Sequence, residues 1–180
     1  MTVPEETRSL PKGELTIRCA AASDAEDLIR GLRCAAGESR FLVSEPEEIT
    51  FTVEDEVRFI EGMNSSPNSV MLLAFWNGEY AGNASIRGSA RLRLRHRGDL
   101  GIALYERFTN LGIGSALLDR LIALAPDMAL EQLELEVSAE NLRAIALYEK
   151  KGFTRCGAMP RGMKFADGSY ADLVHMVRSV

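Results

Sequence analysis

A strand-like apolar run meets a predicted helix through two glycines in residues 100–125, and this junction constrains the fold more than any other stretch. The glycines are Gly112 and Gly114, and Pro126 is expected to end the helix that follows them. The first N–H groups of a helix have no partner within it, and the helix dipole adds positive charge there. The junction therefore predicts an anion-binding turn. Alternatively, the glycines serve only to let the helix pack closely on a sheet.

Two common phosphate-binding motifs do not fit this junction. A Walker loop requires a lysine after the last glycine, and Ser115 stands there instead. The dinucleotide fingerprint requires a third glycine, and Leu117 occupies that position. The turn is therefore not that of a nucleotide-binding fold of either kind.

The order of predicted elements indicates an α/β protein with a central mixed sheet. Thr52 and Asp55 approximate a capping box before a helix, and Asn77-Gly78 predicts a hairpin turn. We predict strands over residues 15–19, 70–76, 80–86, 91–105 with a bend near Gly98, 133–137, 153–165 and 170–178, and helices over 23–36, 52–63, 112–125 and 141–151. Residues 1–14 are polar and are expected to form a flexible arm, leaving residues 15–180 as one domain.

Composition limits the classes that remain. The chain has 180 residues, of which 46% are hydrophobic and 26% charged, with a net charge of −5. These values suit one globular domain and disfavour a disordered chain or a general nucleic-acid binder. No apolar run is long enough to span a membrane, and three scattered cysteines suit neither a disulfide framework nor a metal site. The cysteine usage and the polar N-terminus lead us to expect a cytoplasmic protein.

A second motif decides between the interpretations of the glycine turn. Residues 141–153 read NLRAIALYEKKGF, with Asn141, Ala144, Tyr148 and the pair Gly152-Phe153 in a fixed spacing. Together with the turn at Gly112-Ile113-Gly114, this segment closely resembles the GCN5-related N-acetyltransferase superfamily. The resemblance implies a single-domain α/β fold with a mixed, mostly antiparallel sheet, acetyl-CoA as co-substrate, and acetyl transfer to a primary amine.

The resemblance also implies roles for particular residues. The strand at Ile102, Ala103 and Leu104 would bind the pantetheine arm through its backbone, and Asn141 would contact the same arm. Tyr148 would lie near the thioester sulfur and protonate the leaving thiolate. The pyrophosphate would bind to the backbone of seven consecutive residues, Thr109, Asn110, Leu111, Gly112, Ile113, Gly114 and Ser115.

Two assignments within this resemblance stay open. Thr109 stands where the family has a long Gln or Arg, so we expect weaker but not abolished binding of acetyl-CoA, with Arg107 as a possible substitute. Glu136 matches the glutamate that serves as general base in ribosomal-protein N-acetyltransferases, and Asp99 is the second choice. Either carboxylate could simply face solvent.

Three further features allow a functional and a plain interpretation. Alternating arginines in residues 91–97 could form an anion- or RNA-contacting strip, or an exposed hairpin face. His175 suits a packed histidine better than a metal ligand. The acidic stretch of residues 45–61 could attract a cationic acceptor, or be ordinary helix surface.

The leading functional hypothesis is an N-acetyltransferase in which the amine attacks acetyl-CoA directly in a ternary complex. Residues 160–174 resemble those of enzymes that acetylate amino acids or protein N-termini, so the acceptor is expected to be an amino acid or a peptide N-terminus. The alternative is a non-catalytic acyl-CoA-binding module of the same fold. We expect no metal, nucleic acid or membrane among the partners, and a homodimer is conceivable because such domains often pair through sheet edges.

Overall fold

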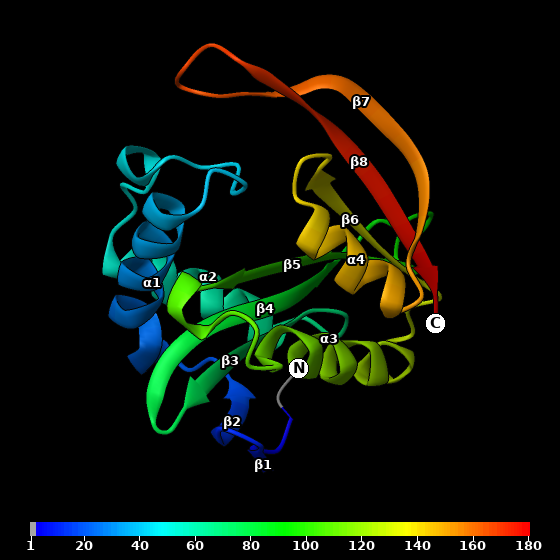
Figure 1. The fold of residues 1–180 in the computed structure, drawn as a ribbon. Coiled ribbons are helices and arrows are strands. Elements are labelled where there is room, and N and C mark those ends of the chain that lie inside the picture. Colours follow the sequence, from blue (N-terminus) through cyan, green and yellow to red (C-terminus); the bar gives the residue numbers. More distant parts are fainter. Residues whose placement is uncertain (1–2) are drawn as a thin grey trace.

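The computed structural model describes residues 3–180 as one eight-stranded sheet with helices on both faces (Figure 1). The strands lie in the order β1-β2-β3-β4-β5-β6-β8-β7, and only the pair β5–β6 is parallel. The predicted α/β domain with a mixed, mostly antiparallel sheet is therefore confirmed.

Eight strands and four helices make up this architecture, with short 3-10 helices in four connections. The strands are β1 (Glu6–Leu10), β2 (Gly13–Cys19), β3 (Val70–Trp76), β4 (Glu79–Gly88), β5 (Arg97–Leu104), β6 (Gln132–Ser138), β7 (Thr154–Lys164) and β8 (Tyr170–Ser179). The helices are α1 (Ala25–Glu38), α2 (Val53–Ser65), α3 (Ile113–Leu124) and α4 (Leu142–Lys150). The 3-10 turns are η1 (Ala22–Asp24), η2 (Pro46–Glu48), η3 (Glu106–Phe108) and η4 (Pro126–Met128).

Local side-chain chemistry sets several of these boundaries as predicted. The Thr52 hydroxyl accepts a hydrogen bond from the Asp55 N–H at 3.2 Å, and the Asp55 carboxylate accepts one from the Thr52 N–H at 2.9 Å, which completes the capping box of α2. Asn77 and Gly78 both have positive φ, 50° and 83°, in the turn between β3 and β4. These values suit the hairpin turn that the Asn-Gly pair predicts.

The N-terminal segment differs from the expected flexible arm. Residues 1 and 2 of that arm lie outside the described part of the chain, but Glu6–Leu10 forms the edge strand β1, paired antiparallel with β2. The hydroxyls of Thr7 and Thr16 lie 3.0 Å apart across the pair, and Leu10 packs on the core. Backbone pairing stabilises this strand although few of its side chains are apolar, which is why the composition of residues 1–14 was misleading.

The arginine-rich stretch is also not the predicted strand. Residues 91–96 form turns, with hydrogen bonds from the Leu94 N–H to the Arg91 carbonyl and from the Arg97 N–H to the Leu94 carbonyl. Gly88 pairs with Gly98 at the end of the β4–β5 ladder, so the intervening residues connect two adjacent strands and have no strand beside them. Alternation alone is insufficient to form a strand without a neighbour, so the arginines of this stretch do not share one strand face.

The helices divide between the two faces of the sheet. A side chain at Gly114 in α3 would meet Ile102 and Leu104 of β5, so these two residues face α3. Ala103 points to the opposite face because successive side chains alternate along a strand. There its ladder partner Asn83 lines a cavity with residues of α1 and α2.

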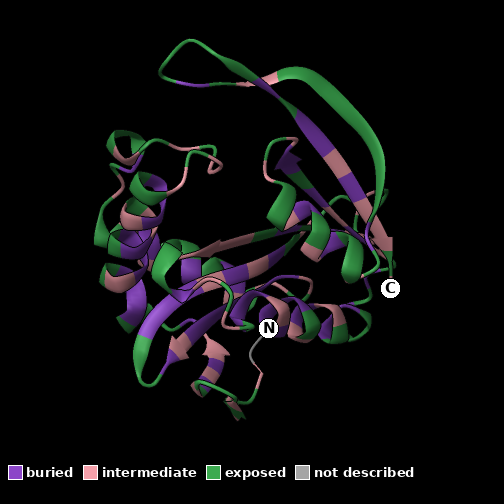
Figure 2. Cartoon of the chain, in the orientation of Figure 1, coloured by how far each residue is buried: buried purple, intermediate pink, exposed green. Residues whose placement is uncertain are grey.

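Burial follows this layering. The central strands are largely buried, whereas β7 is mostly exposed along a long hairpin with β8 (Figure 2). One large cluster of buried apolar residues joins the sheet to all four helices. Within residues 3–180, none of the helices is both long and apolar enough to span a bilayer.

Candidate active site

Strands β5 and β6 separate at the centre of the sheet. Their parallel ladder contains only three pairs, from Arg97–Gln132 to Asp99–Glu134, although β5 continues to Leu104 and β6 to Ser138. Beyond Asp99, β5 pairs only with β4, so one edge of its backbone is left without a strand neighbour. Such an edge presents free N–H and C=O groups, which suit hydrogen bonding to an extended amide-containing ligand.

A cleft of about 460 Å³ occupies this separation. It is lined by residues of the α1–α2 connection, β5, the loop before α3, β6 and α4: Ser39, Phe41, Leu42, Val43, Leu100, Gly101, Ile102, Ala103, Leu104, Phe108, Thr109, Asn110, Gly112, Gly114, Ser115, Glu136, Val137, Asn141, Arg143, Ala144, Leu147 and Tyr148. The volume lies in the range of small-molecule sites.

The N-terminus of α3 opens one end of the cleft. Gly112 precedes the helix with φ of 86°, a left-handed conformation that glycine adopts without strain. The Ala116 N–H donates to the Gly112 carbonyl at 3.0 Å, whereas the three preceding helical N–H groups have no intrahelical acceptor, and no side chain caps the helix. Backbone donors and the helix dipole therefore make this end suitable for a pyrophosphate.

Gly114 keeps the helix close to the strand. A methyl group at this position would lie 3.3 Å from Leu104 Cδ1, 3.5 Å from Leu147 Cδ2 and 3.6 Å from Ile102 Cδ1. All three of these side chains line the cleft, so a larger residue at Gly114 would occupy space between β5, α3 and α4. The sequence left two explanations open for the glycines, close packing and ligand access. Gly114 serves both, because it lets α3 approach β5 and keeps the cleft open.

Two polar residues of α4 line the cleft. The Asn141 Oδ1 caps the helix by accepting the Ala144 N–H at 3.1 Å, and within residues 3–180 its amide nitrogen donates no hydrogen bond. Arg143 is exposed and forms no ion pair with any described residue. It is a cation that could contact a phosphate, and sequence reasoning missed it although it lies two residues after Asn141 in the motif.

Arg107, proposed as a substitute for the missing basic residue at Thr109, is engaged elsewhere. Its guanidinium lies 2.5 Å from the Glu79 carboxylate and over the rings of Tyr105 and Phe108. It does not line the cleft. Thr109 does line it, and its hydroxyl donates to the Glu106 carbonyl at 2.8 Å.

Tyr148 projects from α4 into the buried wall of the cleft. Its ring stacks edge-on against Phe153 with centroids 5.9 Å apart, so packing fixes its orientation. Burial raises the pKa of Tyr148 to about 12, and the phenol therefore stays protonated at neutral pH. A neutral phenol in this position can donate a hydrogen bond to a leaving sulfur.

Glu136 lies on β6, lines the cleft and is half-exposed. Its Oε1 lies 3.2 Å from Nδ1 of His175, its ladder partner on β8. His175 is therefore not a packed core histidine, as its sequence context had indicated, but lies within ion-pair distance of this carboxylate. Such a pair can accept a proton at Glu136 and orient the carboxylate.

The other carboxylates considered are differently placed. Asp99 pairs with Arg87 at 3.0 Å and does not line the cleft. Glu134 accepts a hydrogen bond from Nε of Arg97 at 2.9 Å. Glu136 is thus the carboxylate of these three that faces the cleft.

The structure brings most of the predicted site residues to this one cleft. Leu111 and Ile113 are the exceptions, because Leu111 packs beside the core and Ile113 is buried in it, so they can contribute only backbone groups. The sequence did not indicate Phe41, Leu42 and Val43, which line the opposite wall. No motif marks these three residues, which reach the cleft only through the path of the α1–α2 connection.

Comparison with known proteins agrees with this geometry. Residues 38–153 match the Acetyltransferase (GNAT) family. The chain belongs to this family. It is an acetyl-CoA-dependent N-acetyltransferase.

Three individual proteins show how far the similarity extends. The L-amino acid N-acetyltransferase AaaT of Escherichia coli is 32% identical over 121 residues, which are 66% of this chain and 73% of the relative. A GNAT-family acetyltransferase structure from Streptococcus pneumoniae has 36% identity and a TM-score of 0.89, covering 92% of this chain and 99% of that one. The Salmonella typhimurium yncA structure, a putative acetyltransferase with its cofactor acetyl-CoA, shares the fold at 22% identity and a TM-score of 0.80, covering 92% and 93%.

The residues of this cleft fit acetyl-CoA. The free edge of β5 can pair with the amides of the pantetheine arm, the N-terminus of α3 with the pyrophosphate, and Arg143 with a phosphate. Because Thr109 replaces a long Gln or Arg side chain, the backbone N–H groups at the start of α3 would be the main donors to the pyrophosphate.

Proposed function

We propose that the protein transfers the acetyl group directly from acetyl-CoA to a primary amine, with Glu136 as the base and Tyr148 as the donor to the leaving sulfur. The acceptor is an amino acid or the N-terminus of a peptide. The observation that carries this proposal is that both side chains line the cleft between the separated strands β5 and β6. A homodimer and a cytoplasmic location stay predictions.

Each residue has one part in this reaction. Acetyl-CoA supplies the thioester whose C–S bond breaks as the amine nitrogen forms the new C–N bond. An alkylammonium has a pKa near 10, so the amine must lose a proton, and Glu136 accepts it directly or through water. A backbone N–H on the free edge of β5, that of Leu104, polarises the carbonyl.

Tyr148 acts mainly as a hydrogen-bond donor. Burial raises the pKa of Tyr148 to about 12, whereas a thiol has an ordinary pKa of about 8.5. Complete transfer of the phenol proton to the thiolate is therefore unfavourable, but a hydrogen bond to the sulfur stabilises the charge that develops as the C–S bond breaks. Because the phenol keeps its proton around neutral pH, the rate should show no titration of Tyr148 between pH 6 and 9.

A panel of amino acids and short peptides, read by thiol release and by the mass increase of the acceptor, tests the reaction. Tyr148→Phe should lower kcat about 10- to 100-fold while leaving the affinity for acetyl-CoA nearly intact. Tyr170→Phe, which changes an exposed tyrosine at the start of β8, is the matched control. An unchanged kcat in Tyr148→Phe would remove Tyr148 from the mechanism, and absence of acetyl-CoA binding by calorimetry would overturn the proposal as a whole.

Glu136 is tested in the same assay. Glu136→Gln should lower kcat/KM, because the variant can no longer take up the amine proton. Glu131→Gln, an exposed change just before β6, should leave kcat/KM unchanged. If both variants retain the wild-type kcat/KM, water alone accepts the proton.

A further inference from the structure

The arginine-rich turn between β4 and β5 is a sequence feature that the acetyl-CoA cleft does not use. This arginine turn, residues 87–97, contains five arginines and no acidic residue, and none of its residues lines the cleft. Because the whole chain has a net charge of −5, the rest of the chain carries −10. A dense cationic surface on an otherwise acidic protein favours an anionic partner.

Three of the five arginines are available to such a partner. They are exposed, and within residues 3–180 they have no ion pair and no side-chain hydrogen bond: Arg91, Arg93 and Arg95. Arg87 and Arg97 instead pair with carboxylates of β5 and β6. Leu92, which follows the first of the three arginines, is 77% exposed. Neighbouring guanidinium groups repel one another, so folding alone does not account for this cluster.

Hydrogen bonds hold the arginine turn in place. The His96 carbonyl accepts the Glu131 N–H at 2.8 Å and the Gln132 N–H at 3.1 Å. The Asn68 amide donates to the Ser89 carbonyl at 3.0 Å. Since Asn68 lies three residues after the last residue of α2, the arginine turn adjoins the C-terminal end of this helix. An ordered cationic surface loses little conformational freedom on binding.

Acidic residues gather at the opposite end of α2. Four exposed glutamates lie in its first turn or in the connection before it, and none forms an ion pair with a described residue: Glu45, Glu47, Glu48 and Glu54. The 13 residues of α2 span about 20 Å. This helix therefore separates a negative surface at its N-terminal end from a positive one at its C-terminal end.

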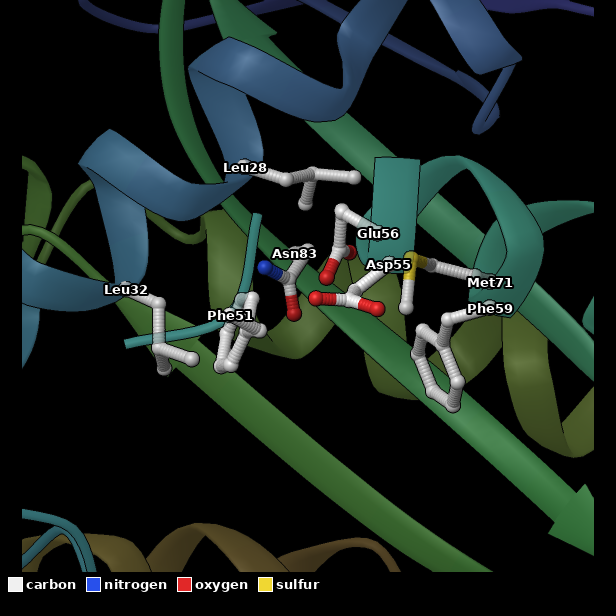
Figure 3. Close-up of a pocket in the computed structure, with 8 residues that line it drawn as sticks. All are labelled: Leu28, Leu32, Phe51, Asp55, Glu56, Phe59, Met71 and Asn83. Carbon is white, nitrogen blue, oxygen red and sulfur yellow. The ribbon is translucent and has the colours of Figure 1, made fainter. Parts of the chain in front are cut away.

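An apolar side chain lies between the two charged ends. Phe59, midway along α2, is 42% exposed and lines a cavity of about 430 Å³ between α1, α2 and the sheet. Figure 3 shows its ring on the opposite side of the Asp55 and Glu56 carboxylates from Phe51. Aromatic residues are enriched in the cores of protein–protein interfaces. The exposed side of α2 thus combines two charged ends with an apolar centre.

We propose that two copies of the chain pair through this surface, with the arginine turn of each copy bound to the glutamates beside the start of α2 in the other. A two-fold axis near Phe59 forms both contacts at once, because the two ends of α2 then lie opposite each other. A second copy is the favoured partner because this chain carries both complementary surfaces. Such a pairing differs from the sheet-edge dimer considered from the sequence, and it is independent of the proposed reaction.

Sedimentation velocity measures this association without any substitution. Wild-type protein should form dimers in a concentration-dependent way between about 1 and 200 μM, the range of a weak specific contact. Raising the salt from about 0.1 M to about 1 M shortens the screening length from about 10 Å to about 3 Å, so it should raise the dimer Kd at least about tenfold. Wild-type protein that stays monomeric over this range at the lower salt would overturn the proposal.

Charge reversal tests which surfaces meet. One variant carries Arg91→Glu, Arg93→Glu and Arg95→Glu, and a second carries Glu45→Arg, Glu47→Arg and Glu54→Arg. Each variant alone should raise the dimer Kd at least about tenfold, because like charges then face each other in both contacts. An equimolar mixture should form heterodimers with a Kd near the wild-type value, because both contacts again join opposite charges. Circular dichroism checks that each variant is folded.

A third variant controls for overall charge. Arg155→Glu, Arg161→Glu and Lys164→Glu reverse the same number of charges on β7, an exposed edge strand, and should leave the dimer Kd near the wild-type value. Equal weakening by this variant would mean that net charge or the sheet edge controls association, which contradicts the proposed surface. The proposal also fails if the mixture of the first two variants does not dimerise, because the arginines and glutamates then do not contact each other.

Discussion

Replacing Asp24 with Asn should destabilise the protein through the start of α1. The Asp24 carboxylate accepts two hydrogen bonds from the Arg18 guanidinium, at 2.7 and 2.8 Å, and one from the Ala21 N–H at 2.8 Å. The Asp24 side chain is 10% exposed and that of Arg18 is 29% exposed, so the pair is largely withdrawn from water. Arg18 also lies over the Phe75 ring at 4.7 Å, which limits its freedom to move elsewhere.

The magnitude follows from what Asn can retain. Its amide oxygen can still accept the Ala21 N–H, but one guanidinium bond is lost and the other no longer joins opposite charges. Hydrogen bonds to charged groups contribute about 1.5–3 kcal/mol, and breaking a fully buried ion pair costs about 3–5 kcal/mol. Because water reaches part of Arg18, we expect Asp24→Asn to lower the free energy of unfolding by about 2–3 kcal/mol at neutral pH.

The pH dependence gives a second and independent test. The hydrogen bond from Arg18 holds the pKa of Asp24 below its ordinary value. A carboxyl group with a lowered folded pKa contributes stability above its unfolded pKa, about 3.9, and loses that contribution as the pH falls through the folded value. The difference between wild type and Asp24→Asn should therefore be full at pH 7 and shrink once the pH falls below the unfolded pKa of about 3.9, so it should be smaller at pH 3 than at pH 7.

Urea unfolding followed by circular dichroism at the two pH values measures both effects. Asp27→Asn on the same helix is the matched control, because Asp27 is 46% exposed and pairs with the exposed Arg30. Exposed pairs contribute at most about 1 kcal/mol, so this control should change little. Equal losses in the two variants, or a loss in Asp24→Asn that persists unchanged in acid, would refute the reasoning.

Three further changes have signs that the structure fixes. Glu56→Gln should raise the melting temperature at pH 7 and not at pH 4. Burial raises the pKa of Glu56, so the wild-type protein loses stability as the pH rises through the folded pKa of this residue. Scanning calorimetry measures the melting temperatures, and an equal shift at both pH values contradicts the prediction. Gly112→Ala places a side chain at φ of 86°, costing about 1 kcal/mol, so it should lower the melting temperature by about 2–4 °C and weaken acetyl-CoA binding. Arg143→Ala should raise the Kd for acetyl-CoA and flatten its salt dependence in calorimetry, and an unchanged salt dependence would exclude a phosphate contact.

Elements defined by local chemistry were predictable from the sequence. The Asn77-Gly78 turn needs positive φ at both residues, and the Thr52–Asp55 cap needs two side chains three residues apart, so a short segment contains all the information. The same holds for Gly112 and Asn141, whose positions at helix starts placed the cofactor end of the cleft. The resemblance added a role for Tyr148, which stays a prediction although the residue lines the cleft.

Features that depend on a neighbouring strand were not predictable in this way. Residues 91–96 alternate like a strand but have none beside them, whereas residues 6–10 are polar and still pair with β2. The pairing of Glu136 with His175 depends on the register of β6 and β8, which joins residues 39 positions apart in the sequence. A sequence pattern describes one segment at a time, whereas register is a property of two paired strands.

The acidic stretch of residues 45–61 shows most clearly what the structure adds. Its charges suggested a cationic acceptor, yet most of its carboxylates are exposed or satisfied, as Asp55 is by Thr52. Asp24 and Glu56 are both largely buried, but their pKa values move in opposite directions because Asp24 has three donors and Glu56 has none. Glu56 thus lowers the stability of the folded protein at neutral pH, whereas Asp24 raises it. The burial and the hydrogen-bond donors of each carboxylate therefore matter more than the number of acidic residues in the stretch.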